Sequence, residues 1–275
     1  MNIGLLGLGL IGGSLGYDLV ARHHYVWGTS RRSETCRQAV AQGVACVAHA
    51  DWQAIPGSDR AEVVVLCVPI DTVLPTLQAI APHLSPATVV TDVASVKGFI
   101  CEAARDWHPR FVGGHPMAGN SGHGLAAAVP NLFRDRPWVL TPLSDTDPTA
   151  VALLRELWST LGAKVQEMPP AVHDRAVARI SHGPVFVSAS ALVPPTPEAV
   201  SLASSGFFDT TRVGGGNPQL GRLMAQYNRE AVLATLQENA ARLQWATAAI
   251  EQERWDDLEA WLQEATHRRQ TYFST

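Results

Sequence analysis

Two histidines occupy positions whose neighbours suit acid–base chemistry. His115 lies within Gly113–Gly119, a Gly-Gly-His-Pro-Met-Ala-Gly segment in which we expect irregular backbone rather than a helix or a strand. His182, in Ser181–Pro184 (Ser-His-Gly-Pro), falls at a break in an otherwise helical pattern. An imidazole titrates near neutral pH, so either side chain could accept a proton. A buried structural histidine is the alternative for each, and for His182 the two interpretations stay equally open.

Ser95 and Lys97 follow a short strand predicted at Val89–Asp92. Ser95 could cap a helix that starts near Val96, which is its simpler role. Lys97 is one of two lysines in a chain that otherwise uses arginine, the second being Lys164. This rarity favours a chemical role for Lys97, although a solvated lysine in a first helical turn is the alternative.

Arg212 ends a polar stretch, Ser204–Arg212, that we interpret as a turn. Its guanidinium could bind a substrate carboxylate through two parallel hydrogen bonds, or it could pair with Asp209. Both interpretations are open on the sequence alone.

A glycine-rich turn predicts the cofactor. The sequence Gly7-Leu8-Gly9-Leu10-Ile11-Gly12 directly follows a strand predicted at Asn2–Leu6 and opens a helical run. In this pattern the first glycine allows a tight turn and the second lets the backbone approach a pyrophosphate. The third lets helix and strand pack closely. We therefore expect a dinucleotide here, with Cys67-Val68-Pro69, at the end of another predicted strand, beside it.

The end of the second predicted strand, Tyr25–Gly28, indicates which dinucleotide binds. NAD-dependent enzymes usually place a carboxylate there for the ribose hydroxyls, whereas this chain has Ser30, Arg31 and Arg32. Hydroxyl and guanidinium groups can bind a 2′-phosphate, so we predict NADP rather than NAD; solvated surface arginines are the alternative. The predicted cofactor-binding residues are Gly7, Gly9, Leu10, Ile11, Gly12, Ser30, Arg31, Arg32, Cys67, Val68 and Pro69.

Alternating short apolar runs and helical segments predict a Rossmann-type, doubly wound α/β sheet over residues 1–168. The run Val63–Val68 is unbroken and β-branched, which is typical of a parallel strand covered on both faces. Ligands of such sheets bind at the carboxyl ends of the strands. Further strands are predicted at Phe111–Gly113, Trp138–Thr141 and Ala163–Glu167, and a helix at Pro148–Leu161.

Residues 169–275 are poor in strand patterns and are predicted to form an all-α domain. Apolar residues spaced by three and four run through Leu220–Ile250 and Trp255–Tyr272, and a proline-rich segment at Val193–Thr196 separates two earlier helices. Asn217-Pro218 predicts the cap and first-turn proline of the longest helix. A bundle this short often completes its core with a second copy, so we expect a homodimer.

Composition argues against several classes of protein. The chain has 275 residues, of which 46% are hydrophobic and 17% charged, as in globular proteins of one or two domains. Its net charge of −4 and the lack of a basic stripe argue against a nucleic-acid partner. Four scattered cysteines argue against a zinc site or a disulfide framework and fit a reducing cytoplasm. No uninterrupted apolar run reaches ~18 residues, so no membrane span is expected.

Taken in order, these motifs resemble those of the prephenate and arogenate dehydrogenase family of tyrosine biosynthesis. The resemblance runs from Gly7–Gly12 through Ser95–Gly98 and Gly113–Gly119 to Ser181–Pro184 and Phe207–Val213, and so spans nearly the whole chain. It implies a Rossmann-type domain followed by a helical domain that dimerises, with the substrate between them.

The resemblance also implies roles for individual residues. His115 would take the proton of the ring hydroxyl as hydride leaves for the nicotinamide, Ser95 would share that hydroxyl, and Arg212 would hold a substrate carboxylate. Oxidation gives a ketone conjugated toward the carbon that carries the carboxylate. Loss of carbon dioxide then aromatises the ring, so the protein supplies little beyond orientation and one base. The other substrate-binding residues that we expect are His182, Val185, Gly119 and Lys97.

One departure from the family pattern bears on the substrate. Prephenate-using members have S-H-L-P-H, with a second histidine that faces the substrate. This chain has Gly183 in place of the leucine and Val185 in place of the second histidine. Valine cannot donate to the keto-acid side chain of prephenate, while arogenate brings its own ammonium group. The stretch Ser204–Pro218 also looks like the cyanobacterial, arogenate-preferring branch. We therefore favour arogenate over prephenate.

Three alternatives accompany this prediction. The nearest is a prephenate dehydrogenase or a dual-substrate cyclohexadienyl dehydrogenase. A β-hydroxyacid dehydrogenase shares the plan but would use a lysine on a later helix, and no lysine follows Lys164. The most distant is a non-catalytic NADP-sensing protein, which would bind cofactor without turnover.

Overall fold

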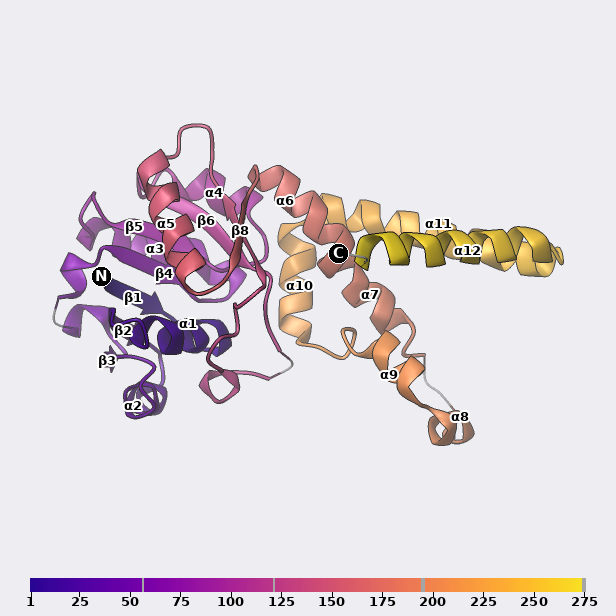
Figure 1. Ribbon diagram of the computed structural model, residues 1–275, viewed down its shortest axis with the longest axis horizontal. Helices are drawn as coiled ribbons and strands as arrows, with labels where there is room; N and C mark the ends of the chain where they lie inside the picture. The colour runs from indigo at the N-terminus through magenta and orange to yellow at the C-terminus, as the bar shows by residue number, and fades with distance from the viewer. Residues whose placement is uncertain (56, 121, 194–195, 274–275) are drawn as a thin grey trace.

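The computed structural model describes residues 1–55, 57–120, 122–193 and 196–273. The first part of the chain is an eight-stranded sheet with the strand order β3-β2-β1-β4-β5-β6-β7-β8 (Figure 1). Neighbouring strands are parallel except for β6 and β7, which are antiparallel. The strands are β1 (Asn2–Leu6), β2 (Tyr25–Thr29), β3 (Val47–His49), β4 (Val63–Leu66), β5 (Val89–Asp92), β6 (Phe111–Pro116), β7 (Pro137–Thr141) and β8 (Lys164–Glu167).

Helices cover both faces of the sheet, so its central strands are buried on both sides. One core cluster contains side chains of α1 (Leu10–Val20), α2 (Ser33–Ala41) and α5 (Pro148–Thr160). The other contains side chains of α3 (Val73–Ile80) and α4 (Gly98–Ala104). All four residues of β4 are fully buried, as its unbroken β-branched sequence predicts. The predicted doubly wound α/β domain is confirmed.

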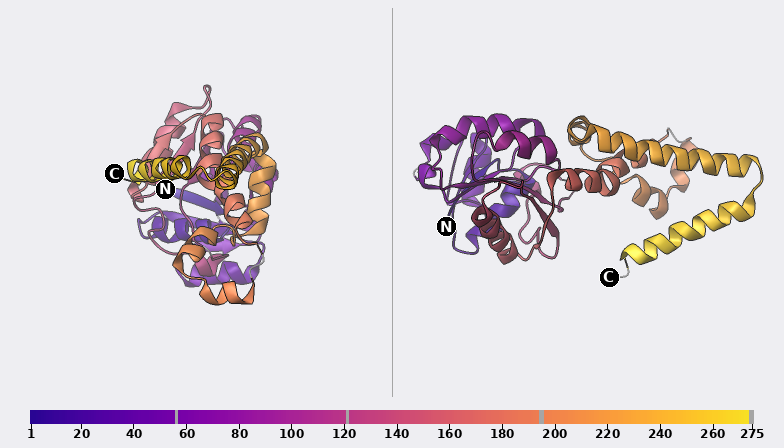
Figure 2. Two further views of the ribbon diagram at one scale, coloured as in Figure 1. Left: turned by 90° about the vertical axis from the view of Figure 1, so that its right-hand side faces the viewer. Right: turned by 90° about the horizontal axis from the view of Figure 1, so that it is seen from above.

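The second part of the chain is helical. Helices α11 and α12 form a hairpin that extends away from the sheet, and α8 and α9 lie at the outer end of α7 (Figures 1 and 2). A π-helical turn, Ala178–His182, joins α6 to α7 and accounts for the break predicted around His182. The helices are α6 (Pro170–Val177), α7 (Gly183–Ser190), α8 (Pro197–Leu202), α9 (Ser205–Thr211), α10 (Pro218–Tyr227), α11 (Arg229–Glu251) and α12 (Trp255–Phe273).

Two predictions about the helical part were wrong. Ser204–Arg212 is not a turn, because residues 205–211 form α9. The helical pattern through Leu220–Ile250 is two helices, broken at Asn228, whose backbone has left the helical region. The cap prediction is confirmed: the Asn217 side chain accepts hydrogen bonds from the backbone N–H groups of residues 219 and 220. It caps α10, however, and not the longest helix, α11.

The boundaries of the sheet also refine the sequence interpretation. Strand β6 continues to Pro116 because antiparallel β7 lies beside it, with His115 opposite Val139. The prediction of irregular backbone around His115 was therefore wrong. Strand β3 had no clear sequence signal, being only three residues long. The expected domain boundary at 168/169 falls between the end of β8 and the start of α6.

The proline-rich segment and the expected lack of a membrane span are the two remaining predictions from the sequence. The proline-rich segment Val193–Thr196 contains residues 194 and 195, which lie outside the described residues; helices α7 and α8 flank it. No helix in the described part of the chain is both long enough and apolar enough to cross a membrane.

Candidate active site

The strand order brings three predicted segments to one edge of the sheet. Strands β1, β4, β5 and β6 are consecutive neighbours, and all three pairs that they form are parallel. The glycine-rich turn, Cys67–Pro69 and the turn containing Ser95 therefore follow strands that end side by side. His115 belongs to the carboxyl-terminal half of β6. This edge is where open α/β sheets bind their ligands.

The glycine-rich turn has the shape that a pyrophosphate requires. Gly7 has φ +111°, which favours glycine, and a Cβ there would overlap the carbonyl oxygen of Cys67. A Cβ on Gly12 would overlap the Gly7 carbonyl, so helix α1 packs directly on the turn. Gly9 differs, because a Cβ there would meet no atom within 4 Å. The open side of the turn thus faces the N-terminus of α1, which has no side-chain cap.

The segment after β2 carries positive charge and no carboxylate. Arg31 and Arg32 are exposed, and neither forms an ion pair with another residue that the structure describes. The Ser30 hydroxyl accepts a hydrogen bond from the backbone N–H of Arg32 (3.3 Å), which folds the segment into a tight turn. These donors fit a phosphate group beside the dinucleotide turn.

His115 is the first member of a buried chain of three side chains. Its Nδ1 lies 2.8 Å from Nε2 of His173, and Nδ1 of His173 lies 2.8 Å from Oδ1 of Asp174. Burial lowers the pKa of His115 well below 6.5, and the neighbouring His173, Lys97 and His182 lower it further. The imidazole of His115 is therefore neutral at neutral pH, which is the state that a general base requires.

Asp174 also binds the turn that carries Ser95. Its two carboxylate oxygens accept the backbone N–H groups of Lys97 and Gly98, each at 2.8 Å. Burial opposes ionisation of Asp174, but the hydrogen bonds from His173 and from these two N–H groups bring its pKa below the usual value. A single carboxylate on α6 thus contacts both the His115 chain and the N-terminus of α4.

Two polar atoms beside this chain are buried without a protein partner. Ser95 Oγ and His182 Nε2 have no partner at hydrogen-bonding distance among the described residues, although the Ser95 backbone lies close enough to the His182 ring to raise its pKa slightly against the effect of burial. The side-chain amide of Asn228 donates to the Asp174 carbonyl oxygen (2.8 Å) and lies 3.2 Å from Nδ1 of His182. Burial lowers the pKa of His182 to about 4, so this ring is neutral as well. Unpartnered buried polar atoms are costly, and a bound ligand is one way to satisfy them.

Lys97 is buried in an ion pair within the sheet domain. Its ammonium is fully buried, forms an ion pair with Asp92 and donates to the carbonyl oxygen of Gly114 (2.9 Å). Asp92 in turn accepts the backbone N–H of Gly114 at 3.1 Å. The alternative of a solvated lysine was wrong, and the prediction of substrate contact gains no support from this geometry. The Lys97–Asp92 ion pair instead links the end of β5 to Gly114 of β6, the residue before His115.

The remaining predicted residues are more dispersed. Val185 is half-buried on α7 and packs against the second core cluster, and Gly119 is exposed after β6. Arg212 is the exposed C-terminal cap of α9, a helix that packs against α7 and lies away from the sheet (Figure 1). Arg212 is therefore outside the cluster that unites His115, Ser95 and His182.

Sequence reasoning missed His173, Asp174 and Asn228. His173 contacts a residue 58 positions away, and Asp174 binds backbone 77 positions away. The only sequence signal for His173 and Asp174 is that a His-Asp pair stands in the first turns of a helix after two prolines, and Asn228 has no such signal. That pattern does not specify a partner.

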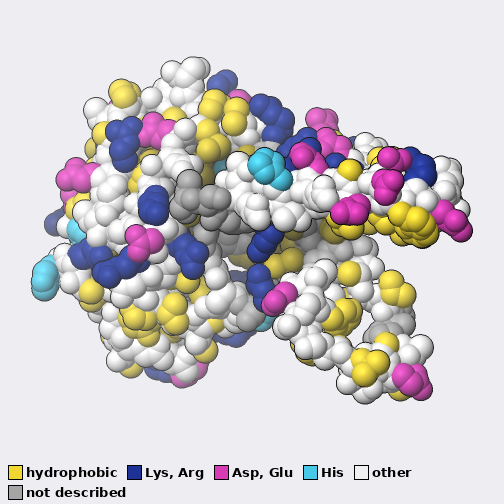
Figure 3. Space-filling view, turned by 45° about the vertical axis from the view of Figure 1, so that its right-hand side comes forward, with side chains coloured by type: hydrophobic (Ala, Val, Ile, Leu, Met, Phe, Trp, Pro, Cys, Tyr) yellow, Lys and Arg dark blue, Asp and Glu magenta, His cyan; other side chains and the backbone are white. Residues whose placement is uncertain are grey.

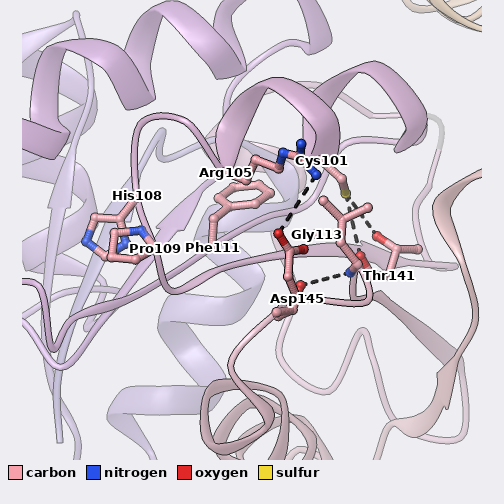
Figure 4. A pocket seen from close by; sticks show the side chains of 10 residues that line it. Cys101, Arg105, His108, Pro109, Phe111, Gly113, Thr141 and Asp145 are labelled. Atoms are coloured by element: carbon pink, nitrogen blue, oxygen red, sulfur yellow. Dashed lines mark hydrogen bonds and ion pairs between the residues drawn. The ribbon is translucent and has the colours of Figure 1, made fainter.

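A separate cavity of about 250 Å³ is lined by Gly113 of β6, two residues before His115 in the sequence (Figure 4). Gly113, Cys101 and Thr141 form its inner end, and Arg105 and Asp145 stand at its rim, where their nearest charged atoms are 3.8 Å apart. Cys101 is buried and lies 3.3 Å from the Thr141 hydroxyl, and burial raises the pKa of its thiol to about 11. None of the predicted site residues lines this cavity.

The fold and the glycine-rich turn together define a dinucleotide-binding oxidoreductase with a helical second domain. Residues 15–167 match the family model of the prephenate dehydrogenase nucleotide-binding domain, and residues 169–264 match that of the prephenate dehydrogenase dimerization domain. The chain therefore belongs to the prephenate dehydrogenase family.

Individual relatives agree with this assignment. The chain is 32% identical to the prephenate dehydrogenase of Bacillus subtilis (strain 168) over 267 residues, which are 92% of this chain and 71% of that protein. The crystal structure of Synechocystis arogenate dehydrogenase is 45% identical, with a TM-score of 0.85 over 99% of this chain and 100% of that one. Prephenate dehydrogenase from A. aeolicus, in complex with hydroxyphenyl propionate and NAD+, is 26% identical, with a TM-score of 0.92 over 99% and 98%.

We predict that Lys97→Met destabilises the fold by about 3–5 kcal/mol, because it leaves the buried Asp92 carboxylate without its counter-ion. Lys164→Met is the matched control, since Lys164 is the only other lysine and is exposed on β8; its effect should stay within about 0.5 kcal/mol. Urea unfolding measures both. Equal, small losses would show that the buried pair contributes little to the fold.

Proposed function

We propose that this chain catalyses the NADP-dependent oxidative decarboxylation of L-arogenate to L-tyrosine. The observation that carries the proposal is the neutral, buried His115 beside two unpartnered polar atoms at the ligand-binding edge of a dinucleotide-type sheet. A base, two hydrogen-bonding groups and a dinucleotide turn are what oxidation of a ring carbinol needs.

The roles of the residues follow from this arrangement. A nicotinamide dinucleotide, when bound, supplies the hydride acceptor. Gly7, Gly9 and the N-terminus of α1 would hold its pyrophosphate. His115 takes the proton of the ring hydroxyl, and Ser95 Oγ shares a hydrogen bond with the same hydroxyl. The ketone so formed is conjugated toward the carbon that carries the carboxylate, so carbon dioxide is lost without a second base.

Two features support arogenate as the substrate. Val185 stands where prephenate-using members have a second histidine, and its side chain cannot donate to a keto acid. The 45% identical Synechocystis enzyme is an arogenate dehydrogenase. The alternatives are a prephenate dehydrogenase, a dual-substrate enzyme and, more distantly, a non-catalytic NADP-sensing protein. Arg212 is proposed to hold a substrate carboxylate; it is exposed at the C-terminal end of α9, outside the cluster of His115, Ser95 and His182.

We propose NADP as the cofactor because Ser30, Arg31 and Arg32 offer hydrogen-bond donors, and no carboxylate, at the end of β2. The relative from A. aeolicus binds NAD+, so both dinucleotides belong in the test. The cytoplasmic location expected from the sequence stays a prediction.

We also propose that two copies of the chain form a homodimer through the helical domain. Exposed hydrophobic side chains gather on the helical arm (Figure 3). Leu202 is 82% exposed on α8 and Phe208 is 62% exposed on α9, and Leu243 and Leu262 are exposed on the α11–α12 hairpin. An apolar surface of this kind marks an interface, and the second family model describes a dimerization domain.

The experiment that tests the function is a steady-state comparison of arogenate and prephenate, each with NADP+ and NAD+, followed by absorbance at 340 nm. We expect efficient turnover only with arogenate and NADP+. Faster turnover of prephenate would contradict the argument from Val185. Binding of NADP without turnover of either acid would favour the sensing protein.

We predict that His115→Asn retains dinucleotide binding but loses turnover by about 10²–10⁴-fold, because a general base is removed while the fold is kept. Stopped assays for turnover and fluorescence titration for binding measure the two effects separately. A loss smaller than about tenfold would exclude His115 as the base.

Replacing Arg31 and Arg32 together by alanine should weaken NADP binding far more than NAD binding, because only NADP carries the 2′-phosphate. Calorimetric titration of both dinucleotides measures the difference. Arg37→Ala is the control, since Arg37 is exposed nearby on α2 but pairs with Glu34. An equal loss of affinity for both dinucleotides would show that the two arginines are solvated surface residues that do not select the cofactor.

Light scattering should give a mass of twice the 29.5 kDa chain. The double variant Leu202→Glu and Phe208→Glu should lower this mass toward one chain, because each substitution places a charge in an apolar interface. Val40→Glu is the control, at an exposed apolar position on α2 of the other domain. A double variant that keeps the wild-type mass would exclude α8 and α9 from the interface.

A further inference from the structure

We propose that Asp174, acting through His173, fixes the tautomer of His115 and so directs the lone pair of His115 Nε2 toward the substrate. The three side chains form one line of hydrogen bonds, with the His115 and His173 rings 5.1 Å apart and inclined at 73°. All three are removed from bulk water: His115 is 7% exposed, His173 1%, and the Asp174 side chain 13%. The inference rests on His115 as the base of the proposed function.

The direction of each hydrogen bond follows from the carboxylate. Asp174 accepts the backbone N–H groups of Lys97 and Gly98, and its pKa is below the usual value despite burial, so at neutral pH it is ionised and can only accept. Nδ1 of His173 therefore carries a proton. When His173 carries this one proton, its Nε2 is an acceptor. Nδ1 of His115, at 2.8 Å, must then be the donor.

The consequence lies on the far side of the His115 ring. With its proton on Nδ1, neutral His115 has a lone pair on Nε2. This is the ring nitrogen that does not contact His173. This is the atom that can take a proton from a substrate hydroxyl. The imidazolium that forms then donates through His173 to the Asp174 carboxylate, which lowers the cost of placing a charge in a buried site.

The same carboxylate aligns the second group that would contact the hydroxyl. By accepting the N–H groups of Lys97 and Gly98, Asp174 fixes the turn that carries Ser95. Asp174 belongs to α6 of the helical part, whereas His115 and Ser95 belong to the sheet domain. Asp174 and His173 are thus positioning residues. Through them, the position of α6 against the sheet domain determines the orientation of the base.

The tautomer can be observed without substrate. The full-length protein, labelled with ¹⁵N in its histidine rings, gives long-range ¹H–¹⁵N correlations that distinguish protonated from unprotonated ring nitrogens. The His115→Asn variant assigns the His115 signals. We expect His115 to be protonated on Nδ1 and unprotonated on Nε2 at neutral pH. An Nε2–H tautomer, or a mixture of the two, would overturn the inference whether or not the protein turns over arogenate.

A matched pair of variants tests the role of His173. In His173→Gln the amide can still donate to Asp174 and accept from His115, so both the tautomer and kcat/KM should be largely retained. In His173→Leu the link is broken, so His115 should lose the Nδ1–H tautomer and kcat/KM should fall about tenfold or more. Dinucleotide binding and thermal unfolding of both variants serve as the measure of an intact fold.

The two variants separate positioning from simple packing. Equal tautomers in the glutamine and leucine variants, or equal losses of kcat/KM, would overturn the positioning role. Failure of the wild-type protein to turn over any tested acid would instead count against the proposed function, and the tautomer measurement would still decide this inference.

Discussion

The candidate site depends on one carboxylate that crosses from the helical part of the chain to the sheet. Asp174 accepts a side-chain hydrogen bond from His173 and two backbone hydrogen bonds from the turn after β5. Without it, the N–H groups of Lys97 and Gly98 would lack these buried acceptors. Ser95, His115 and the start of α4 are therefore held in relation to one another by a residue that belongs to neither β5 nor β6.

The buried Lys97–Asp92 ion pair is a second constraint on the same part of the sheet. The Lys97 ammonium and the Asp92 carboxylate are both fully buried and both bind Gly114, one on its carbonyl oxygen and one on its N–H. Buried ion pairs contribute little net stability over an apolar pair, but they are costly to break and so restrict the geometry around them. Here the restricted geometry is that of the strand residue before His115. The lysine that the sequence singled out thus binds the backbone of Gly114, the residue before His115.

The cluster also contains polar groups that the described residues leave unsatisfied. Ser95 Oγ and His182 Nε2 are buried without partners, and the rings of His115 and His182 are held neutral by burial. A buried polar atom costs about 1–3 kcal/mol when neither water nor a ligand reaches it. A substrate hydroxyl or carboxylate would satisfy both atoms. What distinguishes Ser95 Oγ and His182 Nε2 from other buried atoms without a partner is their position beside the His115 cluster, at the edge of the sheet where open α/β sheets bind ligands.

Much of this protein follows from local sequence. The tight turn at Gly7, the close packing at Gly12 and the cap at Asn217 depend on residues within a few positions, so spacing alone predicts them. The tertiary structure decided the rest. His115 lies on a strand because β7 pairs beside it, the buried Lys97 finds its partners in Asp92 and Gly114, and His173 reaches His115 across 58 positions. Periodicity and capping encode which face of an element is buried, but not which distant side chain meets it there.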